Sequence, residues 1–156
     1  MASLADLHRA VQTTLAGGRL GKPVFVRYFL QYPGELAALM PRLAQATTSA
    51  RTWLGQSLER VYALGTQASG QAFVTLQFRE GGTALILYAR CEPRGERVDL
   101  LVLGSQGALY HAADSTDLWE EQESNPEEPV DPRIRAAIES ALRSGQPELV
   151  MRGAPS

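Results

Sequence analysis

The segment at residues 16–23, Ala-Gly-Gly-Arg-Leu-Gly-Lys-Pro, comes nearest to a nucleotide-binding motif in this sequence. A phosphate-binding loop needs a glycine, four free positions and then Gly-Lys-Ser/Thr, so that backbone N–H groups surround phosphate and a hydroxyl reaches Mg²⁺. Here Ala16 replaces the first glycine and Pro23 replaces the hydroxyl residue. The segment also follows a predicted helix and precedes a predicted strand, the reverse of the required order. We therefore do not expect it to bind phosphate.

The single cysteine and the two histidines form no recognisable metal or catalytic motif. Cys91 has no second cysteine for an internal disulfide, and His8 and His111 lie far apart in the sequence. No familiar zinc spacing joins the three. We expect Cys91 to be a small buried apolar residue, and each histidine to be a packing or surface group. No metal site is predicted.

The composition predicts one globular domain spanning residues 1–156. The hydrophobic share of 44% and charged share of 21% are those of an ordinary folded protein. A net charge of −2 provides no basic field for nucleic-acid binding. The N-terminal residues lack the pattern of a signal peptide, and no apolar run approaches the length of about 18 residues that a membrane helix needs. We expect a cytoplasmic protein without nucleic-acid or membrane partners.

Hydrophobic spacing predicts three helices and six strands. Leu4, Leu7, Val11 and Leu15 mark one face of a first helix that ends at Gly17 and Gly18. A second helix, interrupted or restarted near Pro41, is expected within residues 34–55. Asp131 and Pro132 begin a last helix that ends at Gly145. The predicted strands cover residues 24–30, 58–66, 71–79, 83–91, 97–103 and 108–111, the later ones forming a meander.

Residues 113–131 form a predicted acidic loop. Between Asp114 and Asp131 the sequence carries eight acidic residues and no basic one. The spacing lacks the central glycine of a calcium-binding loop, so a solvated loop is favoured over a cation site.

The order of elements predicts an α+β fold with a mostly antiparallel open sheet of about six strands and helices packed on one face. In residues 71–79, Ala72, Val74, Leu76 and Phe78 share one side, whereas both sides of residues 83–91 are largely apolar. Three helices scarcely cover both faces, so the other face is expected to meet a partner. The candidate interface residues are Phe25, Arg27, Phe29, Phe73, Thr75, Gln77, Tyr88, Arg90, Asp99 and Leu101.

Five segments, taken in order, resemble the C-terminal domain of the Gfo/Idh/MocA oxidoreductases, the family of glucose-fructose oxidoreductase and inositol dehydrogenase. They are residues 15–28 (LAGGRLGKPVFVRY), 53–64 (WLGQSLERVYAL), 73–90 (FVTLQFREGGTALILYAR), 101–110 (LVLGSQGALY) and 134–150 (IRAAIESALRSGQPELV). The resemblance implies an open sheet with helices on one face and dimer contacts on the other. It also implies that Gly18, Gly21 and Pro23 belong to a structural turn.

The sequence departs from this family at every group that would perform chemistry. No two glycines lie two positions apart, so the Gly-x-Gly-x-x-Gly turn of a Rossmann domain is absent, as is the Glu-Lys-Pro that holds the family's catalytic lysine. The family's Asp-x-x-x-His pair falls at Arg42 and Ala46. Hydroxyls at Thr47, Thr48, Ser49 and Thr52 are expected to be ordinary helix-surface groups. Neither a cofactor nor catalytic residues are predicted.

Three functions remain open from the sequence. The leading hypothesis is a stand-alone, catalytically silent domain that acts as a homodimer through the open sheet face or pairs with a full-length oxidoreductase. The second is the substrate-binding half of a split NAD(P)-dependent sugar or inositol dehydrogenase, whose Rossmann subunit is separately encoded. The third is a small-ligand binding module that uses the former substrate side.

Overall fold

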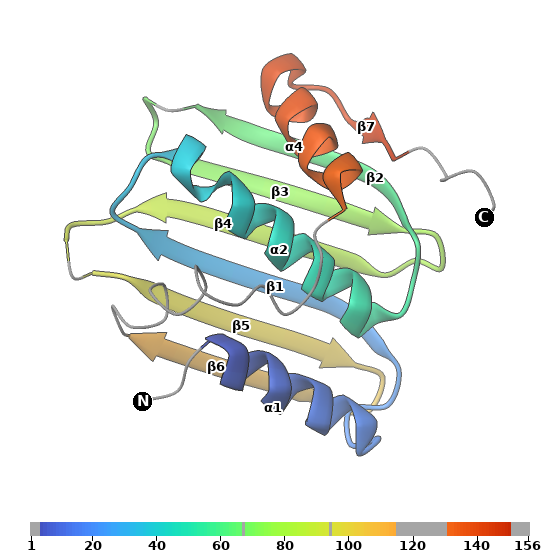
Figure 1. Ribbon diagram of the computed structural model, residues 1–156. Helices are drawn as coiled ribbons and strands as arrows, with labels where there is room; N and C mark the ends of the chain where they lie inside the picture. Colours follow the sequence, from blue (N-terminus) through green and yellow to red (C-terminus); the bar gives the residue numbers. More distant parts are fainter. Residues whose placement is uncertain (1–3, 67, 94, 115–130, 151–156) are drawn as a thin grey trace.

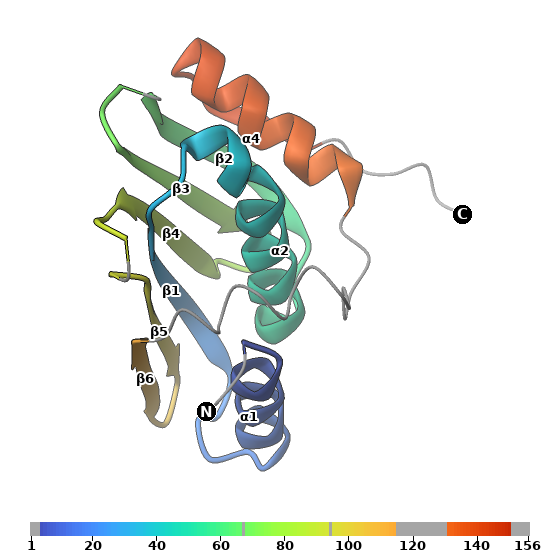
Figure 2. The ribbon, with the colours of Figure 1, turned by 60° about the vertical axis from the view of Figure 1, so that its left-hand side comes forward.

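A sheet with helices on one face makes up the described part of the chain (Figures 1 and 2). The computed structural model describes residues 4–66, 68–93, 95–114 and 131–150. The elements are α1 (Leu4–Ala16), β1 (Pro23–Tyr32), α2 (Leu36–Leu54), β2 (Leu58–Thr66), β3 (Gln71–Phe78), β4 (Thr83–Arg90), β5 (Arg97–Gly104), β6 (Ala108–Asp114), α4 (Pro132–Ser144) and β7 (Glu148–Leu149). The predicted α+β class is confirmed, with the two-residue β7 as a seventh strand.

The strand order β6-β5-β1-β4-β3-β2-β7 places the first strand in the middle of the sheet. β1 pairs in parallel with β4 and antiparallel with β5, and the other neighbours are antiparallel. The predicted meander is therefore correct for β2, β3 and β4 but wrong at the next connection, because β5 is separated from β4 by β1. An apolar strand such as β1, with Val26, Tyr28 and Leu30 buried, gains most where both edges are hydrogen-bonded.

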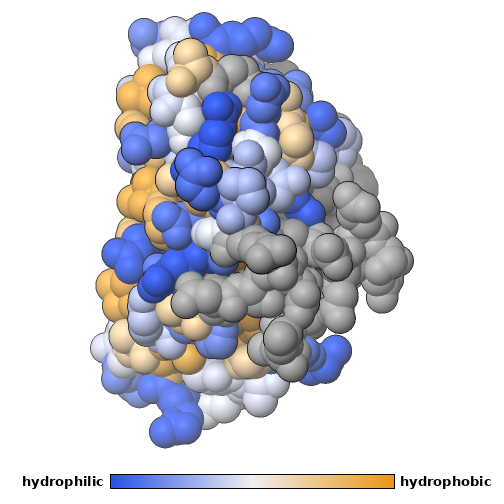
Figure 3. All heavy atoms as spheres, turned by 90° about the vertical axis from the view of Figure 1, so that its left-hand side faces the viewer, coloured by the Kyte–Doolittle hydropathy of each residue, from blue (hydrophilic) through white to orange (hydrophobic). Residues whose placement is uncertain are grey.

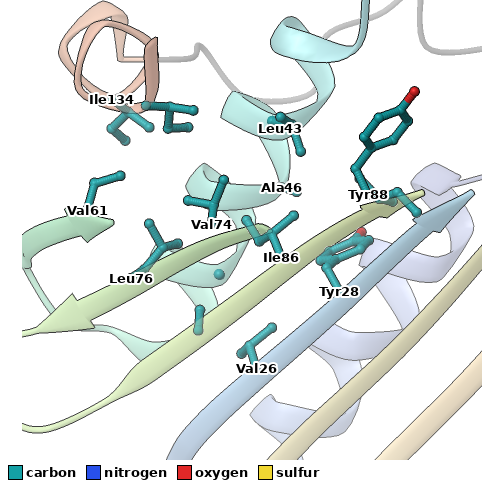
Figure 4. Close-up of a cluster of buried hydrophobic side chains, with 14 of the residues drawn as sticks. Val26, Tyr28, Leu43, Ala46, Val61, Val74, Leu76, Ile86, Tyr88 and Ile134 are labelled. Atoms are coloured by element: carbon teal, nitrogen blue, oxygen red, sulfur yellow. The ribbon is translucent and has the colours of Figure 1, made fainter. Parts of the chain in front are cut away.

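The helices form a single layer. Figures 1 and 2 show α2 lying across the middle strands, α4 beside it over β2, and α1 at the end of the sheet near β6. The strand residues that point toward this layer are almost fully buried, as Figure 4 shows for Val26, Val74, Leu76 and Ile86. The two-residue period of a strand places the intervening residues on the opposite side.

α2 is one continuous helix. The predicted interruption at Pro41 is wrong, because the helix runs from Leu36 to Leu54 with Pro41 inside it. Proline removes one backbone N–H bond there. Burial of the helix on several sides, including Leu39 and Leu43, outweighs that local cost. Its C-terminus is the predicted one, since Gly55 has φ 64° and donates its N–H to the Arg51 carbonyl.

The acidic segment predicted at 113–131 is described only at its two ends. Residues 113 and 114 belong to β6, and Asp131 caps α4 by accepting a hydrogen bond from the Arg133 N–H at 2.9 Å. The predicted start of α4 is thus confirmed, and residues 115–130 lie outside the described residues.

The core residue Ile86 provides a test of this layer. Its side chain is fully buried at the centre of β4. Replacing it with alanine should lower the free energy of unfolding by about 2–5 kcal/mol, because the missing atoms leave a cavity between the sheet and α2. Urea denaturation measures this change. Val24→Ala is the matched control, because Val24 is 43% exposed, and it should cost less than about 1 kcal/mol. Equal losses in the two variants would contradict the assigned burial.

Candidate functional site

The sheet face opposite the helices is covered by no helix or strand of the described chain (Figure 2). We call it the open face. The alternation of each strand and the pairing register assign to it partly or fully exposed side chains, namely Phe25, Arg27, Phe29, Gln31, Arg60, Tyr62, Leu64, Gln71, Phe73, Thr75, Gln77, Thr83, Leu85, Leu87, Ala89, Arg97, Asp99, Leu101, Leu103 and Tyr110.

Apolar side chains run across the open face from strand to strand. One row joins Phe29 on β1, Leu87 on β4, Phe73 on β3 and Leu64 on β2, each opposite the next in the register. Phe73 and Leu64 are 39% and 36% exposed, and Tyr110 at the other end of the face is 56% exposed. Figure 3 shows hydrophobic side chains along the margin of the molecule that carries no helix. Contiguous apolar surface of this kind is typical of an association site.

Most of the predicted interface residues lie on the open face, but Tyr88 does not. Its side chain is 2% exposed, it lies on the side of α2 with Ile86 (Figure 4), and its hydroxyl donates to the Gly34 carbonyl at 2.6 Å. Arg90, two positions later, has the same alternation and lies exposed at the strand end. Both sides of β4 are apolar, so no polar side distinguishes the outward direction of this strand in the sequence. The outward residues of β4 are instead Thr83, Leu85, Leu87 and Ala89.

Charge on the open face is concentrated beside β1. Asp99 accepts a hydrogen bond from Arg97 Nε at 2.9 Å, and its side chain is only 14% exposed. Arg27 lies between Leu101 and Leu85 in the register. No carboxylate of the described residues lies within ion-pairing distance of Arg27. A guanidinium among leucines offers a planar donor for an acceptor outside the chain.

The positions at which the sequence resemblance predicts the family's proton-transfer pair, Arg42 and Ala46, hold no acid or base. The Arg42 guanidinium lies over the Tyr32 ring at 4.9 Å from its centroid, and Ala46 is 5% exposed and packs in the core (Figure 4). Arginine stays protonated in proteins and alanine has no ionisable group. These two side chains therefore cannot exchange a proton with a substrate hydroxyl.

A buried polar cluster joins α1, β1 and α2. His8 Nε2 and the Tyr28 hydroxyl share a hydrogen bond at 2.5 Å, and Ser49 Oγ lies 3.5 Å from His8 Nδ1. The His8 ring meets the edge of Trp53 at a centroid distance of 5.2 Å, and Trp53 stacks on Tyr28. His8 is 8% exposed. The expectation of a packing histidine is thus confirmed, and this packing connects three elements.

Burial sets the ionisation of this cluster. Desolvation lowers the pKa of His8 to about 4 and raises the pKa of Tyr28 above its ordinary value. Both groups are neutral near pH 7. A general base works best with a pKa near the working pH, so the imidazole is suited to structure rather than to proton transfer.

The hydroxyls of α2 are more buried than predicted. Thr47, Thr48 and Ser49 were expected on the helix surface, yet they are 0%, 3% and 6% exposed. Thr47 and Thr48 satisfy their hydroxyls by donating to the Leu43 and Ala44 carbonyls one turn earlier. The error arises because α2 is covered by α1 and α4 as well as the sheet. The sequence contained one sign of the buried Ser49. His8 falls on the apolar helix face marked by Leu4, Leu7, Val11 and Leu15, and a buried imidazole needs a polar partner such as the Ser49 hydroxyl.

Cys91 is partly exposed, which corrects the prediction of a buried residue. It follows the end of β4, where side chains reach the margin of the sheet. Desolvation and then the carboxylates of Glu96 and Glu92 raise the pKa of its thiol. A raised pKa leaves less of the nucleophilic thiolate. The described residues hold no group of three or more His, Cys, Asp or Glu side chains that could bind a metal ion.

The glycine-rich segment near the N-terminus forms a structural turn, as expected. Gly18 and Gly21 have φ of 74° and 67°, values that favour glycine. The Lys22 N–H donates to Ser105 Oγ at 3.0 Å, and the Gln106 N–H donates to the Leu20 carbonyl at 2.9 Å. Of the N–H groups that a phosphate would need, that of Lys22 is bonded to the turn between β5 and β6, and those of Gly17, Gly18 and Gly21 are bonded to backbone carbonyls of residues 13, 15 and 18.

Comparison with known proteins identifies the fold. Residues across 93% of this chain superpose on scyllo-inositol dehydrogenase from Lactobacillus casei with bound NAD(H) and scyllo-inositol, with a TM-score of 0.67 and 13% identity. The match to myo-inositol dehydrogenase from the same organism, in complex with NAD(H) and myo-inositol, covers 96% with a TM-score of 0.68 and 16% identity. The match to the WlbA dehydrogenase from Bordetella pertussis, in complex with NADH and UDP-GlcNAcA, covers 97% of this chain with a TM-score of 0.65 and 15% identity.

The chain spans about 60% of the length of these solved dehydrogenases, with 62%, 60% and 61% of each covered. No protein-family model matches the sequence, and no curated protein sequence is similar to it. None of the helices in the described ranges has the length and hydropathy needed to cross a bilayer. The fold that the sequence resemblance predicted is confirmed: this chain resembles one part of the Gfo/Idh/MocA-type dehydrogenases.

The buried His8 makes stability depend on pH. Its pKa is lower in the folded chain than in the unfolded one. The contribution of His8 to the free energy of unfolding is therefore fully present above pH 6.5 and is lost as the pH falls to about 4. The loss amounts to about 3 kcal/mol by linkage. Urea denaturation of the parent and of His8→Gln should show the parent losing about this much more between pH 7 and pH 4.

The control is His111→Gln, which removes the other histidine from β6. Parallel stability curves for the parent and His8→Gln would show that the buried imidazole does not carry this dependence.

Proposed function

We propose that this chain is a stand-alone relative of the oxidoreductase substrate domain and acts by association, with the open face as the contact between two copies. The single observation that carries the proposal is the continuous apolar row across that face, from Phe29 through Leu87 and Phe73 to Leu64. Its exposure in a monomer is unfavourable, because apolar area in contact with water costs about 25 cal/mol per Å².

The dimensions of the face suit a dimer. Six strands about 4.8 Å apart and about eight residues long give on the order of 600 Å² of flat area per copy. The side chains that project from the sheet add to this area, and a standard interface buries about 800 Å² per partner. A two-fold axis over the sheet would bring the same rows together from both copies. Arg27 would then have access to acceptors on the second copy, such as the carboxylate of Asp99.

The same proposal treats the chain as catalytically silent by itself. Arg42 and Ala46 stand at the positions of the proton-transfer pair, and the sequence contains no Gly-x-Gly-x-x-Gly turn. A dinucleotide fold uses that turn to bring backbone N–H groups to the pyrophosphate. The lack of these groups is what supports the catalytically silent part of the proposal.

A second candidate is the substrate-binding half of a split dehydrogenase. It is supported by the solved structures that share the fold, which are inositol and sugar-nucleotide dehydrogenases holding NAD(H) or NADH. This chain matches about 60% of their length. In this candidate a Rossmann subunit supplies the nucleotide site and meets this chain.

Dimerisation is tested by sedimentation equilibrium of the parent and of Phe73→Glu. Phe73 is exposed on β3, so a carboxylate there is tolerated by the monomer but would be desolvated in the interface. We expect the parent to be a dimer at micromolar concentration and the variant to associate at least about tenfold more weakly. Val24→Glu, at a similarly exposed position on the other side of the sheet, should behave as the parent. A monomeric parent up to about 100 µM would refute the proposal.

Cofactor binding separates the two candidates. The isolated chain should not change NADH fluorescence, and neither NADH nor myo-inositol should raise its melting temperature. A ligand present at a hundred times its dissociation constant stabilises the folded state by about 2.7 kcal/mol, which is readily seen. A saturable shift with NADH would overturn the catalytically silent assignment. A shift with myo-inositol alone would favour the second candidate.

A further inference from the structure

A cavity of about 620 Å³ lies at the end of the helix layer, away from the open face. It is formed where α2 ends, α4 begins, β2 starts and β3 turns toward β4. Arg51, Arg79 and Arg133 line it together with Gln56, and Leu58 and Val150 supply apolar wall. Arg42 and Ala46 do not line it, so it is distinct from the positions of the family's proton-transfer pair.

The charged groups among the described lining residues do not balance. In that part of the chain Asp131 is the one lining carboxylate, against three guanidinium groups, which leaves a charge of +2 on these residues. Arg133 Nη2 lies 2.7 Å from Asp131 Oδ2 and Arg51 Nη1 lies 3.8 Å from the same atom. The hydrogen bond from Arg133 holds the pKa of Asp131 below its ordinary value, so this carboxylate stays ionised. Arg79 pairs with no carboxylate in the described part of the chain.

Gln56 adds neutral donors to the same wall. The residue is 6% exposed as a whole, and its Oε1 accepts the Gly82 N–H at 3.0 Å. Because that N–H requires an acceptor, the amide orientation is fixed and the NH₂ group is left as two donors. Within the described ranges no acceptor is bonded to this NH₂, and Gln56 lines the cavity. The NH₂ group is therefore available to an acceptor oxygen of a ligand in the cavity.

We propose that this cavity binds the phosphate group of a small organic phosphate. The functional groups of the described lining residues that lack a partner are donors, and a phosphate monoester carries a charge near −2 at neutral pH, which matches the +2 of these residues. Guanidinium groups bind phosphate oxygens through paired N–H donors. The volume falls within the range of small-molecule sites, so the organic part has room beside Leu58 and Val150.

The experiment follows amide signals of the full chain by NMR during titration with inorganic phosphate at constant ionic strength. We expect saturable shifts at the Gly82 amide and the Gln56 side-chain NH₂, with a dissociation constant in the millimolar range. Arg79→Gln should weaken binding by about fivefold or more, because one charge-assisted contact is lost. Arg79 is an exposed turn residue, so this variant should keep the fold. Arg19→Gln, at another exposed arginine, is the matched control and should leave the affinity unchanged.

Two further ligands define the chemistry. Acetate carries a single charge and should bind at least about fivefold more weakly than phosphate, whereas glycerol 3-phosphate should bind at least as tightly as inorganic phosphate. The proposal is overturned if phosphate produces no saturable shift up to about 50 mM, if Arg79→Gln and Arg19→Gln have equal effects, or if acetate binds as tightly as phosphate.

Discussion

The packing of α2 on the central strands is the contact on which the rest of the structure depends. Leu39 and Leu43 of this helix are buried in the core, and Figure 4 shows Leu43 on the side of the sheet to which Val26 and Ile86 point. This burial is large enough for the helix to continue through Pro41. It also holds β1 between β4 and β5, where both of its edges are paired. α1 and α4 then complete a single layer on the same side of the sheet.

All described helices lie on one side of the sheet, so none of them covers the other side. Strands near the centre of the sheet are apolar on both sides, as β4 shows with Leu85 and Leu87 on the outward side and Ile86 on the inward side. The described helices cover only the inward side. The inositol and sugar-nucleotide dehydrogenases that share this fold are longer chains. The outward apolar row is the feature that supports the proposed association with a second copy.

Polar groups inside the helix layer serve two different purposes. His8, Tyr28 and Ser49 satisfy one another where α1 meets α2, and their neutral forms are favoured by burial. Beside the C-terminus of α2, Arg79 and the Gln56 amide face a cavity with donors that no described group accepts. The first cluster is closed and structural, whereas the second is open to a ligand. Neither coincides with Arg42 and Ala46.

Much of the local structure followed from the sequence. The extents of the helices, the Asp131 cap, the glycine C-caps and the outward side of β3 all follow from short-range hydrogen bonding and side-chain periodicity. The strand order, the orientation of β4 and the burial of Ser49 did not follow from the sequence. These depend on which distant segment packs on each side, and a strand that is apolar on both sides carries no local record of that choice. Only the tertiary structure placed Tyr88 under α2 and brought Gln56, Arg79 and Arg133 to one cavity.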